Sequence, residues 1–267
     1  MTLERFSHSG LQSFKKCPAQ FKYRYIDQIY KKDEGIEAFL GKRVHETIEY
    51  LYNQVKNGVI PMVDEILKLH KSLWKENWHD SIAIVYQNKS PRDYFYLGEE
   101  CVARFYRQNH PFKEPVIANE HEMIFLLDND ENYKIKGIVD RIDHDGNGNW
   151  EIHDYKTGKR AMSQKEADSD HQLALYQIGL MAEVDEIKSV KLVWHFIQHG
   201  IKVESTRSAE NIRKIITDTK KSIDEIQSKI KNGGKFQPKE SILCNWCYYW
   251  EECPSQSGRN RYIRAIK

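Results

Sequence analysis

The first half of the chain has apolar residues spaced three and four positions apart, which is the pattern of amphipathic helices. Four segments have this spacing: 7–30, 36–57, 61–79 and 91–109. The first of them is interrupted at Cys17-Pro18, because proline fits the first turn of a helix but not its interior. We therefore predict that residues 1–115 are mostly helical.

After Pro115 apolar and polar residues alternate, as they do in strands with one buried face. The segments with this pattern are 116–127, 133–143, 149–156, 189–198 and 201–206. Helical spacing returns at 165–183 and at 208–231. The first three strands are expected to form an antiparallel meander, and the last two a hairpin. Strands and helices in this order predict an α/β fold behind a helical N-terminal part.

The chain of 267 residues is long enough to bury a sizeable core, and no repeat, low-complexity tract or long linker divides it. Its 40% apolar and 30% charged residues are typical of a globular protein rather than a disordered one. We expect one domain over 1–267. It would comprise a helical N-terminal part (1–115), a core (116–207), and a C-terminal helix with a cysteine region (208–267).

Charge and hydropathy exclude few functions. The formal net charge of +2 is too small to indicate a nucleic-acid partner by itself. No window is apolar enough for a membrane span, and the first residues lack the apolar segment of a signal peptide, so we expect a cytoplasmic protein without membrane contact. In a reducing cytosol, the five cysteines are expected to be thiols or metal ligands rather than disulfides.

Acidic residues and a lysine lie on two neighbouring predicted strands. Asp140 follows Gly137-Ile138-Val139 on one strand, and Asp154-Tyr155-Lys156 ends the next. Side chains alternate along a strand, so Asp154 and Lys156 share a face on which Asp140 can meet them. Two carboxylates suit Mg²⁺ or Mn²⁺, which activates water for attack on a phosphodiester, and Lys156 could stabilise the developing charge. Asp-x-Lys alone is more often a solvated pair, so its surroundings must decide.

Other polar residues strengthen the case for a site. His45 lies near the start of a predicted helix, and imidazole as a ligand favours Mn²⁺ somewhat over Mg²⁺. Gln172 and Tyr176 are four residues apart and therefore share one helical face. Glu120 and Glu122 are weaker candidates for a second metal or for outer support of the site, the alternative being two solvated side chains.

Three cysteines crowd near the C-terminus: Cys244, Cys247 and Cys253. Cys17 is the best candidate for a fourth ligand, because Cys101 falls within a predicted helix as a small buried residue. Four thiolates hold either zinc or an iron–sulfur cluster, and their spacing does not distinguish the two. In either case the metal would join the two ends of the chain.

Taken together, the motifs resemble the RecB-like branch of the PD-(D/E)XK nucleases over residues 7–257. The resemblance implies a restriction-endonuclease-like core, with a central mixed sheet flanked by helices. It also implies that Mg²⁺ or Mn²⁺ is bound by four residues, the last through its main-chain carbonyl: His45, Asp140, Asp154 and Tyr155. Lys156 would serve the attacking water, while Gln172 and Tyr176 would support the site or contact the DNA backbone.

The same resemblance implies a cofactor. CRISPR-associated exonucleases and helicase–nuclease B subunits of this branch carry a 4Fe-4S cluster on an N-terminal cysteine and a C-terminal trio. This favours the cluster over zinc, on four residues of this chain: Cys17, Cys244, Cys247 and Cys253.

Five basic residues near the motifs are candidate DNA contacts: Lys42, Arg43, Arg141, Lys159 and Arg160. Residues 14–25 interleave bases with aromatics, which suits either stacking of single-stranded bases or a buried helix face. The chain has no phosphate-binding motor loop, so unwinding would need a helicase partner.

The main hypothesis is an exonuclease that acts on single-stranded or frayed DNA ends in repair, recombination or CRISPR adaptation. Self-association is compatible with this hypothesis. One alternative is a non-catalytic clamp that binds DNA ends and supports a partner nuclease or integrase. Another is a zinc protein with unrelated hydrolase chemistry.

Overall fold

The computed structural model describes residues 3–256 and 258–262, and its N-terminal half is helical as predicted. The elements are α1 (His8–Lys16), α2 (Pro18–Phe21), the π-helical turn η1 (Lys22–Ile26), α3 (Ile36–Lys56), α4 (Val63–Asn77) and α5 (Pro91–Asn109). The predicted break is confirmed, because Cys17 ends α1 and Pro18 begins α2. Two-residue strands β1 (Glu34–Gly35) and β2 (Ile82–Ala83) pair in parallel. They are too short to leave a periodic pattern in the sequence.

A five-stranded mixed sheet forms the centre of the fold, as expected. Its strands, in spatial order, are β3 (Val116–Leu126), β4 (Lys134–His144), β5 (Asn149–Lys156), β6 (Ser189–Phe196) and β7 (Ile201–Ser205). The predicted meander β3-β4-β5 and the hairpin β6-β7 are antiparallel, whereas β5 and β6 are parallel. A parallel pair needs a crossover, and helices supply it between β5 and β6.

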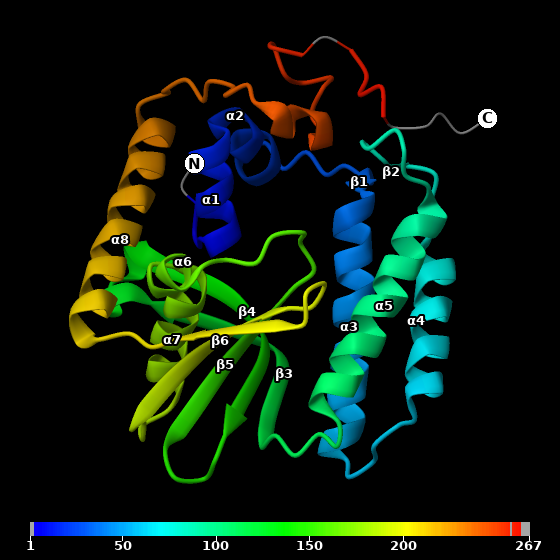
Figure 1. The fold of residues 1–267 in the computed structure, drawn as a ribbon. Coiled ribbons are helices and arrows are strands. Elements are labelled where there is room, and N and C mark those ends of the chain that lie inside the picture. Colours follow the sequence, from blue (N-terminus) through cyan, green and yellow to red (C-terminus); the bar gives the residue numbers. More distant parts are fainter. Residues whose placement is uncertain (1–2, 257, 263–267) are drawn as a thin grey trace.

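Helices cover both faces of the sheet (Figure 1). On one face, α7 (Gln172–Glu183) and α8 (Ala209–Lys231) share a core with α1, and Ile152 of β5 belongs to this core. On the other face, α3, α4 and α5 form a second core that includes Tyr155. Ile152 and Tyr155, three residues apart on β5, thus pack into opposite cores, as the alternation of side chains along a strand requires.

The predicted helix 165–183 is in fact two helices, α6 (Gln164–Asp168) and α7. The Asp170 side chain accepts hydrogen bonds from the backbone N–H groups of Gln172 (2.8 Å) and Leu173 (3.3 Å). An aspartate side chain that accepts hydrogen bonds from the unpaired N–H groups of a first helical turn favours the start of a helix there. As a result, Gln172 lies at the start of α7 rather than in the middle of a helix.

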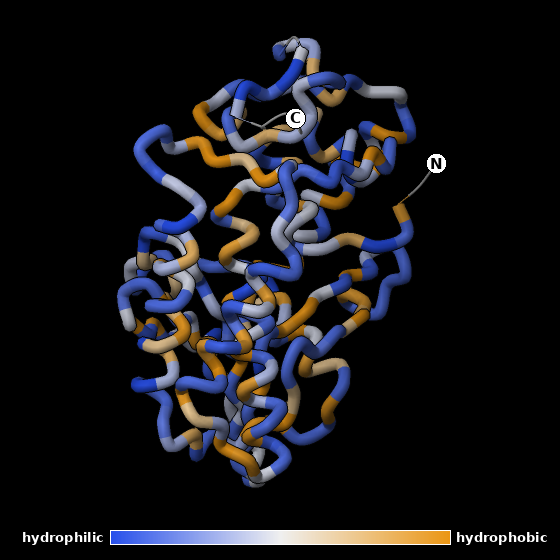
Figure 2. The backbone as a smooth tube through the Cα atoms, turned by 90° about the vertical axis from the view of Figure 1, so that its right-hand side faces the viewer, coloured by the Kyte–Doolittle hydropathy of each residue, from blue (hydrophilic) through white to orange (hydrophobic). Residues whose placement is uncertain are grey.

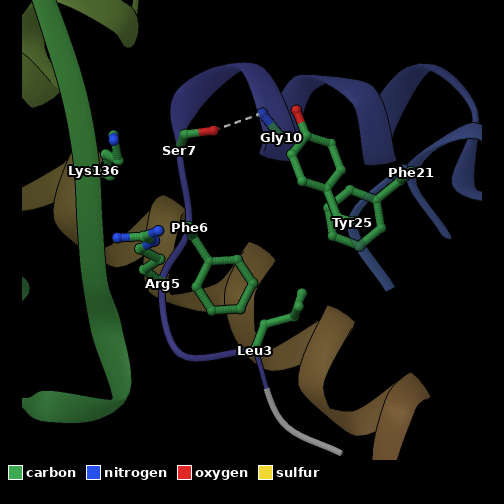
Figure 3. A pocket seen from close by; sticks show the side chains of 8 residues that line it. All are labelled: Leu3, Arg5, Phe6, Ser7, Gly10, Phe21, Tyr25 and Lys136. Atoms are coloured by element: carbon green, nitrogen blue, oxygen red, sulfur yellow. Dashed lines mark hydrogen bonds between the residues drawn. The ribbon is translucent and has the colours of Figure 1, made fainter. Parts of the chain in front are cut away.

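The N-terminal segment pairs with the middle of the sheet. The register of β5 on β4 covers only Arg141–His144, and further along β4 Phe6 takes the place of a strand. The Phe6 N–H donates to Lys134 O at 2.8 Å, and Phe6 O accepts from the Lys136 N–H at 2.7 Å. Beside this pairing lies a cavity of about 180 Å³. In Figure 3 the rings of Phe6, Phe21 and Tyr25 form one side of it, and Arg5 and Lys136 lie on the other.

Hydrophobic and hydrophilic positions alternate along the backbone throughout the molecule (Figure 2). This alternation is what amphipathic helices and half-buried strands require. Within 3–256 and 258–262, no helix is both long and apolar enough to cross a membrane.

Candidate functional site

Three residues that are distant in the sequence meet where α3 passes the end of β5. His45 of α3 places Nε2 2.8 Å from the carbonyl oxygen of Tyr155 and Nδ1 3.5 Å from Oδ1 of Asp140. The other oxygen of Asp140 accepts a hydrogen bond from the Tyr155 N–H at 2.6 Å. Asp140 therefore joins β4 to β5 beyond their regular pairing.

Glu120 of β3 completes this group, and an irregularity in the strand positions it. Its backbone has a φ of 45°, and its Oε1 lies 3.9 Å from His45 Nδ1. In the neighbouring strand Val139 and Ile142 belong to the same core, so β4 also changes face at Asp140. Irregular strands often direct side chains into active sites, and a positive φ in a residue other than glycine costs free energy.

A second set of polar residues lies on the face of β5 that α7 covers. Lys156 Nζ is 2.9 Å from Oδ1 of Asp154 and 2.8 Å from Oε1 of Gln172. Gln172 Nε2 donates to the same Asp154 oxygen at 2.8 Å and lies 3.4 Å from the Tyr176 hydroxyl. Gln172 therefore holds both the acid and the lysine in place. The sequence predicted that Asp154 and Lys156 share a face and that Gln172 and Tyr176 share another on a helix, and the structure brings the four side chains together.

Burial and charge shift the pKa values of these groups. Burial raises the pKa of Asp154 to about 6, although the Lys156 ammonium pulls it down. Burial alone would lower the pKa of Lys156, but Asp154 outweighs it and the pKa lies above its usual value. Burial likewise opposes protonation of His45, yet the carboxylates, Asp140 first, raise its pKa well above the usual range. The carboxylates of the site thus stabilise positive charge on His45 and Lys156.

The donor atoms fit a hard divalent cation. One ligand atom each from His45, Glu120 and Asp140 lies within 4.8 Å of the others, and the Tyr155 carbonyl is adjacent. Carboxylate and carbonyl oxygens suit Mg²⁺ and Mn²⁺, and an imidazole adds a preference for Mn²⁺. Asp154 is outside this tight group, and its Oδ2 lies 2.8 Å from Lys156 Nζ. A cation bound to that oxygen would therefore share it with the lysine.

Two of the five basic candidates are not DNA contacts. Arg141 is 1% exposed, pairs with Asp143 at 3.0 Å and covers the Tyr52 ring at 4.4 Å. Arg43 is buried as well and pairs with Glu46. The expectation that they hold phosphate is therefore wrong, because both guanidinium groups are used inside the fold.

The other three basic candidates are exposed. Lys42 is bound to Glu34 and Arg160 to Glu166. Lys159 lies over the Tyr86 ring, 3.9 Å from its centre. Glu122, the weaker acidic candidate, pairs with Lys136 at 2.6 Å and does not join the site.

A further group of possible ligands lies on the face of the sheet that α3 and α5 cover: Asp143, Glu151 and His153. The buried Arg141 guanidinium already occupies it, 3.0 Å from Asp143 and 3.2 Å from both ring nitrogens of His153. A fixed positive charge at this distance disfavours a metal ion.

Two glycines allow close approach at the site. A Cβ on Gly137 would lie 2.7 Å from the ring of Tyr176, and a Cβ on Gly41 would lie 3.0 Å from Thr157 Oγ1. Gly137 therefore makes room for the tyrosine beside β4, and Gly41 lets α3 approach the end of β5.

The four cysteines proposed as ligands gather where the two ends of the chain meet. Burial is the main cause that raises the pKa of Cys247, and the thiols of Cys17, Cys244 and Cys253 raise it further. Polar groups point at the sulfurs: Lys239 N–H at Cys17 (3.4 Å) and Ser241 N–H at Cys244 (3.5 Å). Cys101, in contrast, is buried within α5, and none of the five cysteines forms a disulfide.

Hydrogen bonds tie the cysteine region to the N-terminal part. The Tyr23 hydroxyl donates to Glu252 O at 2.9 Å, and the Tyr249 hydroxyl donates to Ile29 O at 3.0 Å. In Figure 1 the C-terminal segment passes over α2 and the end of α3. The cysteine region thus packs against the helices that lead to His45.

Comparisons with known proteins give a similar fold and a family. A candidate exonuclease from Eubacterium rectale, known from a crystal structure, is similar in fold, with a TM-score of 0.56 and 16% identity over 99% of this chain and 90% of its own. The structure of SSO0001 aligns over 96% of this chain and 88% of its own at 13% identity, with a TM-score of 0.41. No curated protein matches the chain. The family model of the PD-(D/E)XK nuclease superfamily matches residues 5–254, and the chain therefore belongs to that superfamily.

Proposed function

We propose that the chain is a cytoplasmic Mg²⁺- or Mn²⁺-dependent deoxyribonuclease of the RecB-like branch, which removes nucleotides from single-stranded or frayed DNA ends. The observation that carries the proposal is the meeting of His45, Glu120 and Asp140 at the Tyr155 carbonyl, beside the Asp154–Lys156 pair. Repair, recombination and CRISPR adaptation all use such an activity.

Each side chain has a chemical task in this proposal. His45, Glu120, Asp140 and Asp154 would hold the metal together with the Tyr155 carbonyl. The bound metal would lower the pKa of a water molecule and neutralise charge on the phosphate. Lys156, fixed by Gln172, would orient that water and stabilise the negative charge that develops on the phosphate. The Tyr176 hydroxyl, next to Gln172, is placed to contact the DNA backbone.

Cleavage of end-labelled DNA tests the enzyme against a non-catalytic clamp. Single-stranded and duplex substrates are compared with Mg²⁺, with Mn²⁺ and with a chelator, for wild type, Asp140→Asn and Asp154→Ala. Asp145→Asn, in the exposed turn between β4 and β5, is the matched control. We expect cleavage by wild type and the control, and a loss of at least about 100-fold in the two site variants, because metal stabilisation is worth several kcal/mol. Binding without cleavage by wild type would favour the clamp.

We further propose a 4Fe-4S cluster on Cys17, Cys244, Cys247 and Cys253. The proposal draws on the position of the four thiols where the two chain ends meet, and the choice of the cluster over zinc rests on the resemblance to the RecB-like nucleases. Its task would be to join the chain ends rather than to transfer electrons. Iron, sulfide and zinc analysis after anaerobic purification tests this, and a colourless protein with stoichiometric zinc would contradict it.

The proposed enzyme has no motor, so duplex DNA would reach it through a helicase, or an integrase would receive its products. Co-purification with such a partner and the mass of the native protein, with or without self-association, are the corresponding measurements.

A further inference from the structure

A hollow of about 290 Å³ lies where the chain leaves β5, and Thr157 and Lys159, which follow Lys156, are among the residues that line it. Segments that are far apart in sequence line it: Glu37 of α3, Tyr86 after β2, Tyr94 of α5, Lys159 after β5, and Trp246 between two of the proposed cluster ligands. No residue proposed for catalysis lines it, so the activity described above does not account for it.

The walls of this hollow are aromatic. The rings of Tyr86 and Trp246 meet edge to face, with centres 5.7 Å apart, and Lys159 Nζ is 3.9 Å from the centre of the Tyr86 ring. Tyr86 is 40% exposed and lies in the loop that follows β2. Exposed aromatic rings next to a cation are the usual means of binding single-stranded nucleic acid, because a base stacks while the cation meets its phosphate.

Polar atoms line one edge of the hollow. The two oxygens of Glu37 accept hydrogen bonds from the Tyr94 hydroxyl (2.8 Å) and from Trp246 Nε1 (3.2 Å). Each carboxylate oxygen has a further lone pair. Gln198 donates through Nε2 to Thr157 O at 2.5 Å, so its carbonyl oxygen is not used in that bond. These acceptors suit the amino groups on the edge of an unpaired base.

The hollow and the metal site share two elements. Glu37 and His45 are eight residues apart on α3, which corresponds to about 12 Å along the helix axis. On the other side, Lys159 follows Lys156 by three residues. A DNA strand with its phosphate at the metal site would therefore have a neighbouring base within reach of the hollow. The size is adequate, since a cavity of about 150 Å³ already holds one benzene ring.

We propose that the hollow formed by Tyr86, Trp246, Glu37 and Lys159 binds one unpaired nucleobase of the DNA strand, one or two nucleotides from the phosphate that is cut. The proposal rests on the proposed nuclease function and specifies its substrate: a strand must be unpaired at this position. It also gives the cysteine region a part in substrate binding, because Trp246 lies between Cys244 and Cys247.

An abasic scan tests the proposal. Fluorescein-labelled single strands carry one abasic nucleotide, moved stepwise from the free end, and binding is followed by anisotropy without added divalent metal. We expect wild type to bind roughly tenfold more weakly when the abasic nucleotide is at one position, because stacking of one base on an aromatic ring is lost. Tyr86→Ala should bind the intact strand roughly tenfold more weakly and no longer respond to the abasic position.

Two variants complete the test. Tyr86→Phe keeps the ring and should behave as wild type. Tyr96→Ala removes another exposed tyrosine, which contacts Arg92 on α5, and should also behave as wild type. Equal binding of all abasic strands by wild type, or identical behaviour of Tyr86→Ala and Tyr96→Ala, would overturn the proposal.

Cleavage of the intact strand with Mn²⁺, measured in parallel, separates this proposal from the one on which it rests. Cleavage by wild type without a position-dependent abasic effect rejects the base site and keeps the nuclease. A position-dependent effect without any cleavage keeps the base site and rejects the nuclease.

Discussion

The carboxylate of Glu120 lies 3.9 Å from Nδ1 of His45, whereas Glu122, two residues further along β3, forms an ion pair with Lys136. The two glutamates are thus a matched pair in which one belongs to the site. We expect Glu120→Gln to raise the Mn²⁺ concentration needed for half-maximal cleavage by about tenfold, as is typical for residues that support a metal site. Glu122→Gln should leave that concentration unchanged. Equal metal requirements in both variants would exclude Glu120 from the site.

Gly137 is expected to be sensitive to the smallest substitution. In Gly137→Ala the new methyl group would lie 2.7 Å from the Tyr176 ring, so the ring, whose hydroxyl is 3.4 Å from Gln172, must shift. We expect a loss of stability of about 1–3 kcal/mol from overpacking, together with slower cleavage. Adding Gly137→Ala to Tyr176→Leu should cost much less, since the ring is already absent. Additive effects in this double-mutant cycle, measured by urea unfolding, would show that the two residues do not interact.

The cysteines divide into two groups with different expected behaviour. Cys244→Ser should lose most of its iron and lower the melting temperature, because an open metal site no longer joins the chain ends. Cys101 is buried and its pKa is raised to about 11 by burial, so its thiol is unreactive. Cys101→Ala should keep the iron and lose only about 1 kcal/mol. Iron content and thermal melting of both proteins, purified anaerobically, provide the comparison.

Acid is expected to destabilise the α3–α5 layer through His70. This side chain is fully buried next to Thr47, with 3.2 Å between its Nδ1 and the threonine hydroxyl, and burial lowers its pKa to about 4. Between pH 6.5 and pH 4 the unfolded chain binds a proton that the folded protein does not. The contribution of neutral His70 is therefore complete above pH 6.5 and is lost as the pH falls toward 4, by about 3 kcal/mol.

The variant His70→Gln isolates this effect from that of the other histidines. Its stability deficit relative to wild type, measured by urea unfolding, should shrink as the pH is lowered from 7 to 4.5. A deficit that stays constant over this range would mean that His70 takes up protons equally in both states.

The sequence predicted the main elements well because amphipathic periodicity is a property of each segment by itself. The ends of α3, α4 and α5 lie within about two residues of the predicted ends, which is the usual uncertainty of helix boundaries. The division of helix 165–183 was missed because it depends on the Asp170 side chain capping α7. An aspartate just before an apolar helical stretch is an available signal for such a start.

Within the site, residues on regular segments were easier to predict than those at irregular ones. Asp154 and Lys156 are two residues apart on an ordinary strand, so their common face follows from spacing alone. Glu120 reaches His45 from a backbone with a φ of 45°, which nothing in the local sequence requires. Arg141 was misassigned for a related reason: β4 changes face beside Asp140 and turns this guanidinium toward Tyr52.

The pairing of Phe6 with β4 has a consequence for the handling of this protein. Where β5 diverges from β4, the backbone of residues 134–136 is paired with a single residue of the N-terminal segment, Phe6. A truncation that removes Phe6 would uncover amide and carbonyl groups in the interior of the sheet, and open strand edges recruit other chains. Shortened versions of the protein should therefore keep Phe6.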